Sequence, residues 1–191
     1  MIKLPPLKKI KENMDQFEAD RDKLIRISRD IVRLSKQIIY SFHRDELKSA
    51  ADLQKEADKH FATMAALIKK NPSLTTEGSA RIAVQEYVEA KAFGEVLTKG
   101  QIPGYEEGFL DEENYLLGLC DLVGELNRRA VNAAIKGDTS TPLQIRDVVD
   151  QLYGFFIQLD LGNGELRKKV DGIKYELKKL ENLVLEQKHN A

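Results

Sequence analysis

Apolar residues recur every three or four positions over most of this 191-residue chain, and this spacing constrains its fold more than any other feature. Because an α-helix turns about 100° per residue, side chains three and four positions apart lie on one face. The stretches from Leu24 to Phe42 and from Leu166 to Val184 both repeat in this way. The alternating pattern typical of strands is nearly absent. The sequence therefore predicts an all-α protein.

Helix-ending and helix-starting residues divide the periodic sequence into separate helices. The end signals are Asn71-Pro72, Gly100 and Gly137, and the start signals are Asp111 and Thr141-Pro142. Asp111 can accept hydrogen bonds from free N–H groups of a first turn, Gly137 suits a left-handed helix end, and the Thr141 hydroxyl precedes a proline at a first helical position. The predicted helices span 12–42, 45–70, 76–100, 111–136, 141–161 and 165–187, with a loop over 101–110. Since we find no repeat or linker, we expect residues 1–191 to form a single domain, an antiparallel bundle of about six to seven helices.

Composition excludes several classes of protein. With 30 basic and 31 acidic residues the formal net charge is -1, so any nucleic-acid surface must come from local segregation of charge. The single cysteine, Cys120, excludes an internal disulfide and fits a reducing compartment. No apolar run approaches the roughly 20 residues that span a bilayer. Residues 1–6 lack the apolar core of a signal peptide. We expect a cytoplasmic protein with no membrane contact.

The predicted helix 76–100 carries two acids, Glu86 and Glu89, on one side. They share that side with Ile82, Phe93, Val96 and Leu97. This helix is apolar nearly all round, so it is expected to be largely buried. Two ionised acids among apolar side chains are costly unless they gain a cation, an arginine or a shared proton. This pair is the strongest indication of a site.

The predicted helix 111–136 carries a second pair, Asp121 and Glu125, opposite its apolar stripe and beside Gly118. The face is open to two interpretations: a solvated polar surface, or a surface turned toward helix 76–100, a cavity or a subunit interface. Glycine in a helix costs about 1 kcal/mol relative to alanine. The presence of Gly118 and Gly124 in mid-helix therefore indicates close packing or a functional site. Gly118 would allow another backbone to approach closely.

Two helices that each present two acids could form an oxygen cage for a hard cation. His43, His60 and His189 do not supply the two Glu-x-x-His pairs that a di-iron bundle needs, and a zinc site would usually use Cys or His. Carboxylates alone favour Mg²⁺ or Mn²⁺, which often bind phosphate substrates. Attack of metal-activated water on a phosphodiester is the natural chemistry for such a site.

Basic side chains indicate a polyanionic substrate. The predicted nucleic-acid-binding residues are Arg26, Arg29, Arg33 and Lys36, which share one face of the first helix, and Arg128, on the acidic side of helix 111–136. The alternative for the first-helix group is a solvated face. The run Arg167-Lys168-Lys169 is a weaker second patch. We expect Cys120, Tyr87 and Phe93 to be core residues rather than site residues.

Several motifs together resemble the translin/Trax family, and the resemblance covers most of the chain. They lie at 27–31 (ISRDI), 85–90 (QEYVEA), 108–111 (GFLD), 115–118 (YLLG), 121–126 (DLVGEL) and 137–138 (GD). The acidic motifs at 85–90 and 121–126 are similar to the Trax branch, which carries its catalytic acids there. The tail 166–179 is more similar to translin, which lacks the first acidic motif and the Asp of the second.

Matched residue by residue, the resemblance implies that Glu86, Glu89, Asp121 and Glu125 are the Trax-type catalytic acids. Glu89, Asp121 and Glu125 would be metal ligands, and Glu86 a ligand or a water-orienting base. The family further implies a translin-like helical protomer, assembly into a closed octameric shell, and metal-dependent cleavage of single-stranded RNA inside it.

The mixture of Trax-like acids and a translin-like tail suggests a single-gene prokaryotic form that builds homo-oligomers, and heteromeric assembly stays open. The leading hypothesis is a Mg²⁺- or Mn²⁺-dependent endoribonuclease acting on single-stranded RNA. The alternative is a translin-like oligomer that binds single-stranded RNA or DNA without cleaving it. A third interpretation is a purely structural helical oligomer.

Overall fold

The structure, a computed structural model, describes residues 5–105 and 110–189. Its elements are α1 (Pro5–His43), α2 (Leu47–Lys70), the 3₁₀-helix η1 (Pro72–Thr76), α3 (Gly78–Lys99), α4 (Glu112–Ile135), α5 (Ser140–Phe156) and α6 (Glu165–His189). The described ranges hold six α-helices and no strand, which confirms the predicted all-α fold. No helix in these ranges is long and apolar enough to cross a membrane.

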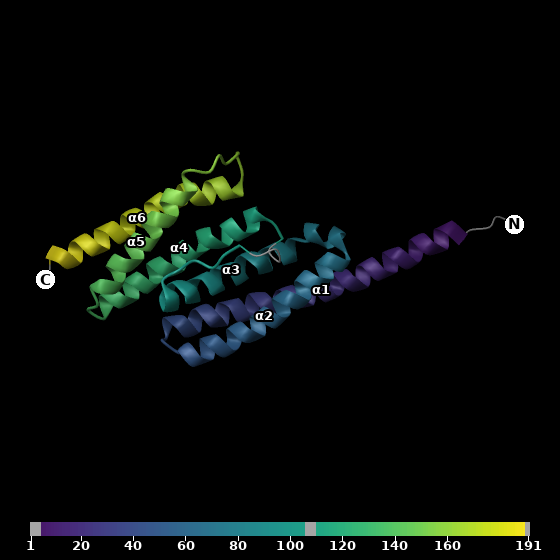
Figure 1. The fold of residues 1–191 in the computed structure, drawn as a ribbon, viewed down its shortest axis with the longest axis horizontal. Coiled ribbons are helices and arrows are strands. Elements are labelled where there is room, and N and C mark those ends of the chain that lie inside the picture. Colours follow the sequence, from purple (N-terminus) through teal and green to yellow (C-terminus); the bar gives the residue numbers. More distant parts are fainter. Residues whose placement is uncertain (1–4, 106–109, 190–191) are drawn as a thin grey trace.

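The helices form an elongated bundle in which α3 and α4 occupy the middle (Figure 1). α1 packs against α2 and α3 on one side, and α5 and α6 pack against α4 on the other. α3 and α4 also pack directly on each other. The two predicted acidic helices are therefore neighbours.

Several predicted helix ends are confirmed. The Asp111 carboxylate accepts a hydrogen bond from the Asn114 backbone N–H at 2.7 Å, as expected of an N-cap. Gly137 has φ 80° and Gly100 has φ 64°, the left-handed conformation that glycine adopts without steric cost.

Other boundaries were predicted wrongly. α1 begins at Pro5 rather than near residue 12, α2 begins at Leu47 because Asp45 has φ 61°, and η1 was not predicted. The first turn of α5 is capped by the Asp138 carboxylate, which accepts the backbone N–H groups of Ser140 and Thr141, and not by the Thr141 hydroxyl. Residues 106–109, with Gly108 and Phe109 of one family motif, and residues 1–4 lie outside the described residues.

The core runs the length of the bundle. Its largest fully buried side chains include Leu24, Ile31, Leu34, Ile38, Phe93, Leu122, Leu126, Phe156 and Ile173. Cys120, Tyr87 and Phe93 are core residues as predicted, and burial raises the pKa of the Cys120 thiol to about 12. Ile82, expected in the buried side of α3, is 54% exposed, whereas Glu86, Glu89, Val96 and Leu97 on that side are partly buried and Phe93 is fully buried.

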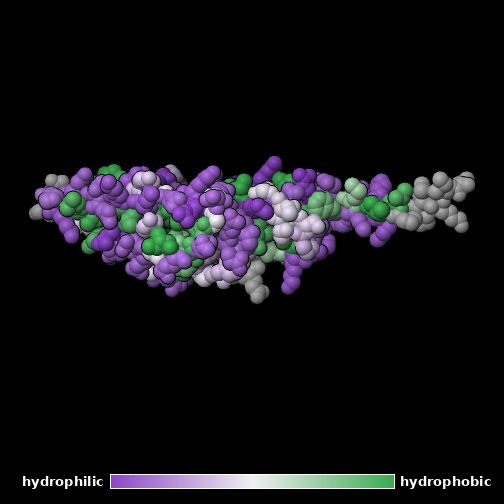
Figure 2. Space-filling view, turned by 90° about the horizontal axis from the view of Figure 1, so that it is seen from above, coloured by the Kyte–Doolittle hydropathy of each residue, from purple (hydrophilic) through white to green (hydrophobic). Residues whose placement is uncertain are grey.

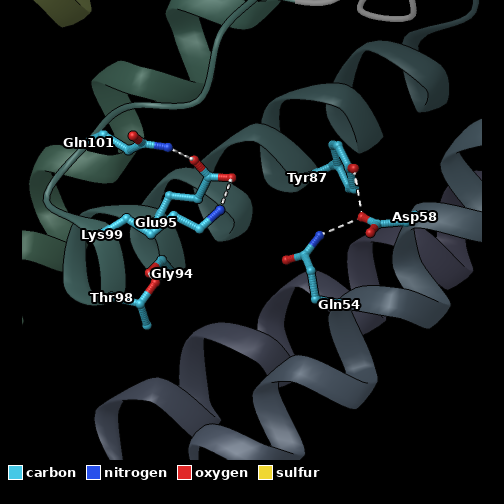
Figure 3. A network of polar contacts seen from close by, with 8 residues as sticks. All are labelled: Gln54, Asp58, Tyr87, Gly94, Glu95, Thr98, Lys99 and Gln101. Atoms are coloured by element: carbon cyan, nitrogen blue, oxygen red, sulfur yellow. Dashed lines mark hydrogen bonds and ion pairs between the residues drawn. The ribbon is translucent and has the colours of Figure 1, made fainter.

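Contacts with α2 fix the rotation of α3 (Figure 3). Tyr87 stacks on Phe61 with ring centroids 4.1 Å apart and donates a hydrogen bond to Asp58 at 2.8 Å. In the same view Glu95 accepts hydrogen bonds from Lys99 at 3.2 Å and from Gln101 at 3.1 Å, which ties the following loop to α3. Residues two apart on a helix lie on roughly opposite sides. Anchoring Tyr87 on α2 therefore turns Glu89 away from α2.

Candidate functional site

A close helix–helix contact sets the relation of the two acidic helices. A Cβ added to Gly118 of α4 would lie 2.7 Å from the carbonyl oxygen of Gln85 and 2.8 Å from Cβ of Val88, both on α3. The Gln85 amide also donates a hydrogen bond to the Asn114 side chain at 2.8 Å. The α4 face at Asn114 and Gly118 therefore turns toward α3 and is not a solvated surface. Gly124 has open space around it, so the packing reason expected there is absent from the described chain.

Three helices line a cavity of about 370 Å³ that is open to solvent, beyond this contact. It is lined by Lys36, Ile39 and Tyr40 of α1, Glu86 and Glu89 of α3, and Glu125 and Arg128 of α4. The structure thus brings together three of the four predicted catalytic acids and two of the predicted nucleic-acid-binding residues.

Glu89 is the most strongly perturbed acid. Its pKa is raised to about 8, first by burial and then by repulsion from Asp121, Glu86 and Glu125, while Lys169 opposes the shift. All four predicted acids therefore belong to one electrostatic cluster. A cluster of this kind is stabilised either by a retained proton or by a cation.

Glu125 is held by a histidine that the sequence analysis did not select. His43, at the end of α1, lies with Nε2 2.5 Å from a Glu125 oxygen, and Arg128 lies 3.6 Å from the same oxygen. The hydrogen bond from His43 holds the pKa of Glu125 below its usual range. The imidazole is buried against Phe93, with ring centroids 4.9 Å apart. A signal for it exists in the sequence, because His43 lies four residues after the apolar Ile39 and therefore on the same side of the predicted helix.

The end of α1 that carries His43 is itself fixed by α4. Arg129 donates hydrogen bonds to the Phe42 carbonyl oxygen at 3.1 Å and to the Asp45 carboxylate at 2.6 Å. The Arg129 hydrogen bond lowers the pKa of Asp45. These contacts satisfy a carbonyl at a helix C-terminus and position His43 over Glu125.

Asp121 is directed toward α6. Lys169 Nζ lies 2.8 Å and 2.7 Å from its two carboxylate oxygens. Asp121 does not line the cavity. Lys169 was predicted only as part of a weak basic patch, and the structure instead places it in the acid cluster.

The donor set suits a hard cation, but its oxygens do not converge. Within the described ranges, no group of three or more His, Cys, Asp and Glu side chains is arranged to hold a metal ion. Asp121 and Glu125 accept hydrogen bonds from Lys169 and His43 instead, and Glu86 lies 3.6 Å from Lys36 Nζ. Carboxylate oxygens are nevertheless the ligands that Mg²⁺ and Mn²⁺ prefer, and a bound cation would offset the repulsion that the other three acids exert on the buried Glu89. Their role as metal ligands stays a prediction.

The predicted basic face of α1 is exposed and leads to the cavity. Arg26, Arg29, Arg33 and Lys36 are all exposed, and Arg33 pairs with Asp30 of its own helix at 3.3 Å. By the rise of an α-helix, Arg26 lies about 15 Å along the axis from Lys36 at the cavity rim. A single strand lying along this face would therefore reach the acids.

A family profile and individual relatives both show that this sequence is similar to translin. The sequence profile described as "Translin family" matches residues 19–188. Human translin is 41% identical over 104 residues, covering 54% of this chain and 45% of translin. The chain thus matches slightly less than half the length of these curated relatives. Translin-associated protein X of Rattus norvegicus is 26% identical over 218 residues, covering 92% of this chain and 74% of that protein.

Solved structures share the whole fold. A crystal structure of apo-NeC3PO superposes with a TM-score of 0.90 at 29% identity, covering 98% of this chain and 100% of that one. A structure of AfC3PO in a complex with duplex RNA has a TM-score of 0.88 at 22% identity, covering 97% of both chains. This second likeness concerns the fold alone.

Proposed function

This chain belongs to the translin family, and from that premise and the acid cluster between α3 and α4 we propose that it is a Mg²⁺- or Mn²⁺-dependent endoribonuclease that cleaves single-stranded RNA. The assembly that goes with this function is a homo-oligomer, an octameric shell by analogy with the family. A structure of AfC3PO with duplex RNA supports RNA as the polymer bound by this fold.

The observation that carries the proposal is the state of Glu89. A largely buried carboxylate surrounded by three others is unfavourable for folding in its ionised form, and the rise of its pKa to about 8 has the same cause. Arrangements that destabilise a protein and shift a pKa strongly are concentrated at functional sites. A purely structural bundle would bury an apolar side chain at this position.

The cavity rim offers groups for each part of a nucleotide. Lys36 and Arg128 can neutralise phosphate oxygens, and the exposed ring of Tyr40 can stack on an unpaired base. Glu86 faces the same cavity and can accept a proton from an attacking water. Bound between the acids, a divalent cation would supply Lewis-acid activation of that water and of the scissile phosphate.

The alternative function is RNA or DNA binding without cleavage. The observation in its favour is that Lys169 already forms an ion pair with Asp121 and His43 already lies within hydrogen-bond distance of Glu125. A protein that keeps these internal pairs would present the basic face of α1 and an inert acid cluster.

The decisive experiment incubates the full-length protein with a labelled single-stranded RNA and either Mn²⁺, Mg²⁺ or EDTA. We expect divalent-dependent internal cleavage that Glu89→Gln and Asp121→Asn each reduce by about 10²-fold or more. Glu56→Gln, an exposed acid on α2, serves as the matched control and is expected to cleave like the parent. Uncut RNA at every divalent concentration would contradict the nuclease assignment.

A binding measurement separates the two functions. In EDTA the parent and Glu89→Gln are expected to bind the same RNA with similar affinity, because the phosphates contact Lys36 and Arg128 rather than the acids. Calorimetric titration with Mn²⁺ in the absence of RNA should show a site in the parent that Asp121→Asn weakens. RNA binding without a Mn²⁺ site would establish the non-catalytic alternative.

A further inference from the structure

The first turns of α1 project beyond the bundle as an arm, which we define as residues 7–16. Every residue of the arm is exposed, and this end of α1 extends past the other helices (Figure 1). Leu7, Ile10 and Met14 on the arm are 56%, 53% and 63% exposed, and Figure 2 shows hydrophobic residues on the projecting part. A helical segment of this length is marginal by itself in water, so an uncovered apolar stripe on it points to a missing partner.

The stripe on the arm is in phase with the core-facing side of α1. Leu7, Ile10, Met14 and Phe17 are spaced by three, four and three residues, and the buried Leu24 lies seven residues after Phe17 on the same side. Phe17 already packs partly on the bundle core. This spacing is that of a and d positions in a coiled coil, whose favoured partner is another helix with the same spacing.

The charges of this part of α1 are divided along its length. Residues 7–11 contain three lysines, Lys8, Lys9 and Lys11, and no acid. Residues 12–18 contain three acids, Glu12, Asp15 and Glu18, and no basic residue. A parallel pair of such helices would place like charges side by side. An antiparallel pair places the basic end of each helix along the acidic part of the other.

We propose that the arm pairs antiparallel with the arm of a second copy of this chain. A two-fold axis near Glu12 would set Leu7 beside the partner's Phe17 and Ile10 beside the partner's Met14. The contact is self-complementary, as a two-fold interface requires. The intrahelical pair Lys11–Asp15, at 2.6 Å, is exposed on the surface and too weak to prevent this arrangement.

So short a contact is one interface within a larger assembly rather than a stable dimer by itself. It concerns the homo-oligomer that the proposed function uses, but it requires neither RNA nor metal. Failure of RNA cleavage would therefore leave this inference unaffected.

Disulfide cross-linking of the full-length protein tests the pairing, in a Cys120→Ala background. Asn13→Cys lies beside the proposed axis, so oxidation is expected to give covalent dimers. In Leu7→Cys the two thiols of an antiparallel pair lie about ten residues apart, roughly 15 Å, and should not join. Glu56→Cys on α2 gives the rate of random collision at an exposed helical site. The proposal would be overturned if Asn13→Cys forms covalent dimers no faster than this control, or if Leu7→Cys forms them efficiently.

Charge reversal tests the direction of pairing. Lys8→Glu, Lys9→Glu and Lys11→Glu together should slow Asn13→Cys cross-linking about tenfold, because acids then face acids. Adding Glu12→Lys, Asp15→Lys and Glu18→Lys to the same chain should restore the rate. Cross-linking that ignores the first triple change, or is not recovered by the second, would show that charge complementarity does not guide the contact.

Discussion

At the scale of single residues, two glycines of α4 have opposite roles although both lie in mid-helix. Gly118 contacts the backbone of α3, whereas Gly124 has no neighbour within reach of a Cβ. From the sequence, both were predicted to serve close packing or a functional site, because each is a residue of low helix propensity in the middle of a helix. Only the neighbouring helix distinguishes them.

Gly118→Ala is expected to destabilise the protein by about 1–3 kcal/mol, since its Cβ would lie 2.7 Å from the Gln85 carbonyl oxygen. Gly124→Ala, the matched control, should be neutral or stabilise by up to about 1 kcal/mol through helix propensity alone. Urea denaturation of the three proteins measures both effects. Equal stability of the two variants would mean that α3 and α4 do not pack in this way.

Glu89 makes stability depend on pH. Its pKa is raised from 4.5, the ordinary value expected in the unfolded chain, to about 8 in the folded chain. Between these pH values the folded protein therefore binds one more proton than the unfolded chain. The free energy of unfolding should therefore fall as pH rises from about 4.5 to 8, by a few kcal/mol, and then level off. Glu89→Gln should flatten this fall and be more stable than the parent at pH 8.

Chemical denaturation at several pH values without divalent ions measures this profile, and Glu56→Gln should keep the parent's curve. Mn²⁺ should reduce the fall in the parent, because a cation stabilises the ionised cluster. A parent and a Glu89→Gln variant with parallel curves would contradict the account of Glu89.

At the scale of elements, the start of α5 shows why helix capping was predicted only in part. The sequence located the start correctly near Thr141-Pro142, but two polar residues could cap it. In the structure Asp138 receives hydrogen bonds from Ser140 and Thr141, which lower its pKa to about 2. The choice depends on the path of the chain after Gly137, which the local sequence does not specify.

Asp138→Ala is therefore expected to destabilise the protein by about 1 kcal/mol, the usual cost of losing a capping side chain. Asp138→Asn keeps an accepting oxygen and should lose much less. Thermal unfolding followed by circular dichroism compares them. A larger effect from Thr141→Val than from Asp138→Ala would restore the original assignment of the cap to Thr141.

At the scale of the whole molecule, the basic face of α1 and the acid cluster form one surface through the cavity rim. Near-zero net charge gives no attraction for a polyanion at long range, so we propose that RNA binding depends on this local face. Arg26, Arg29 and Arg33 on this face are exposed. Arg33 forms an exposed ion pair with Asp30 of its own helix, and the described residues show no ion pair for Arg26 or Arg29.

Replacing Arg26, Arg29 and Arg33 by Gln one at a time should each lower the slope of log affinity against log salt by about 0.7 for single-stranded RNA. The measurement is fluorescence anisotropy in EDTA over a range of KCl concentrations. Lys55→Gln on α2 is the control and should keep the parent's slope. A slope unchanged in all three arginine variants would place the binding surface elsewhere.

The sequence by itself determined that the chain is helical, where most helices end, and which four acids stand on two of them. These features depend on periodicity and capping within a few residues, and such information is local. Only the tertiary structure decided that α3 and α4 are neighbours, that His43 and Lys169 join their acids, and that the first turns of α1 stand free of the bundle. Contacts between residues 48 to 82 positions apart arise from the packing of whole helices, and no local pattern records which partners that packing brings together.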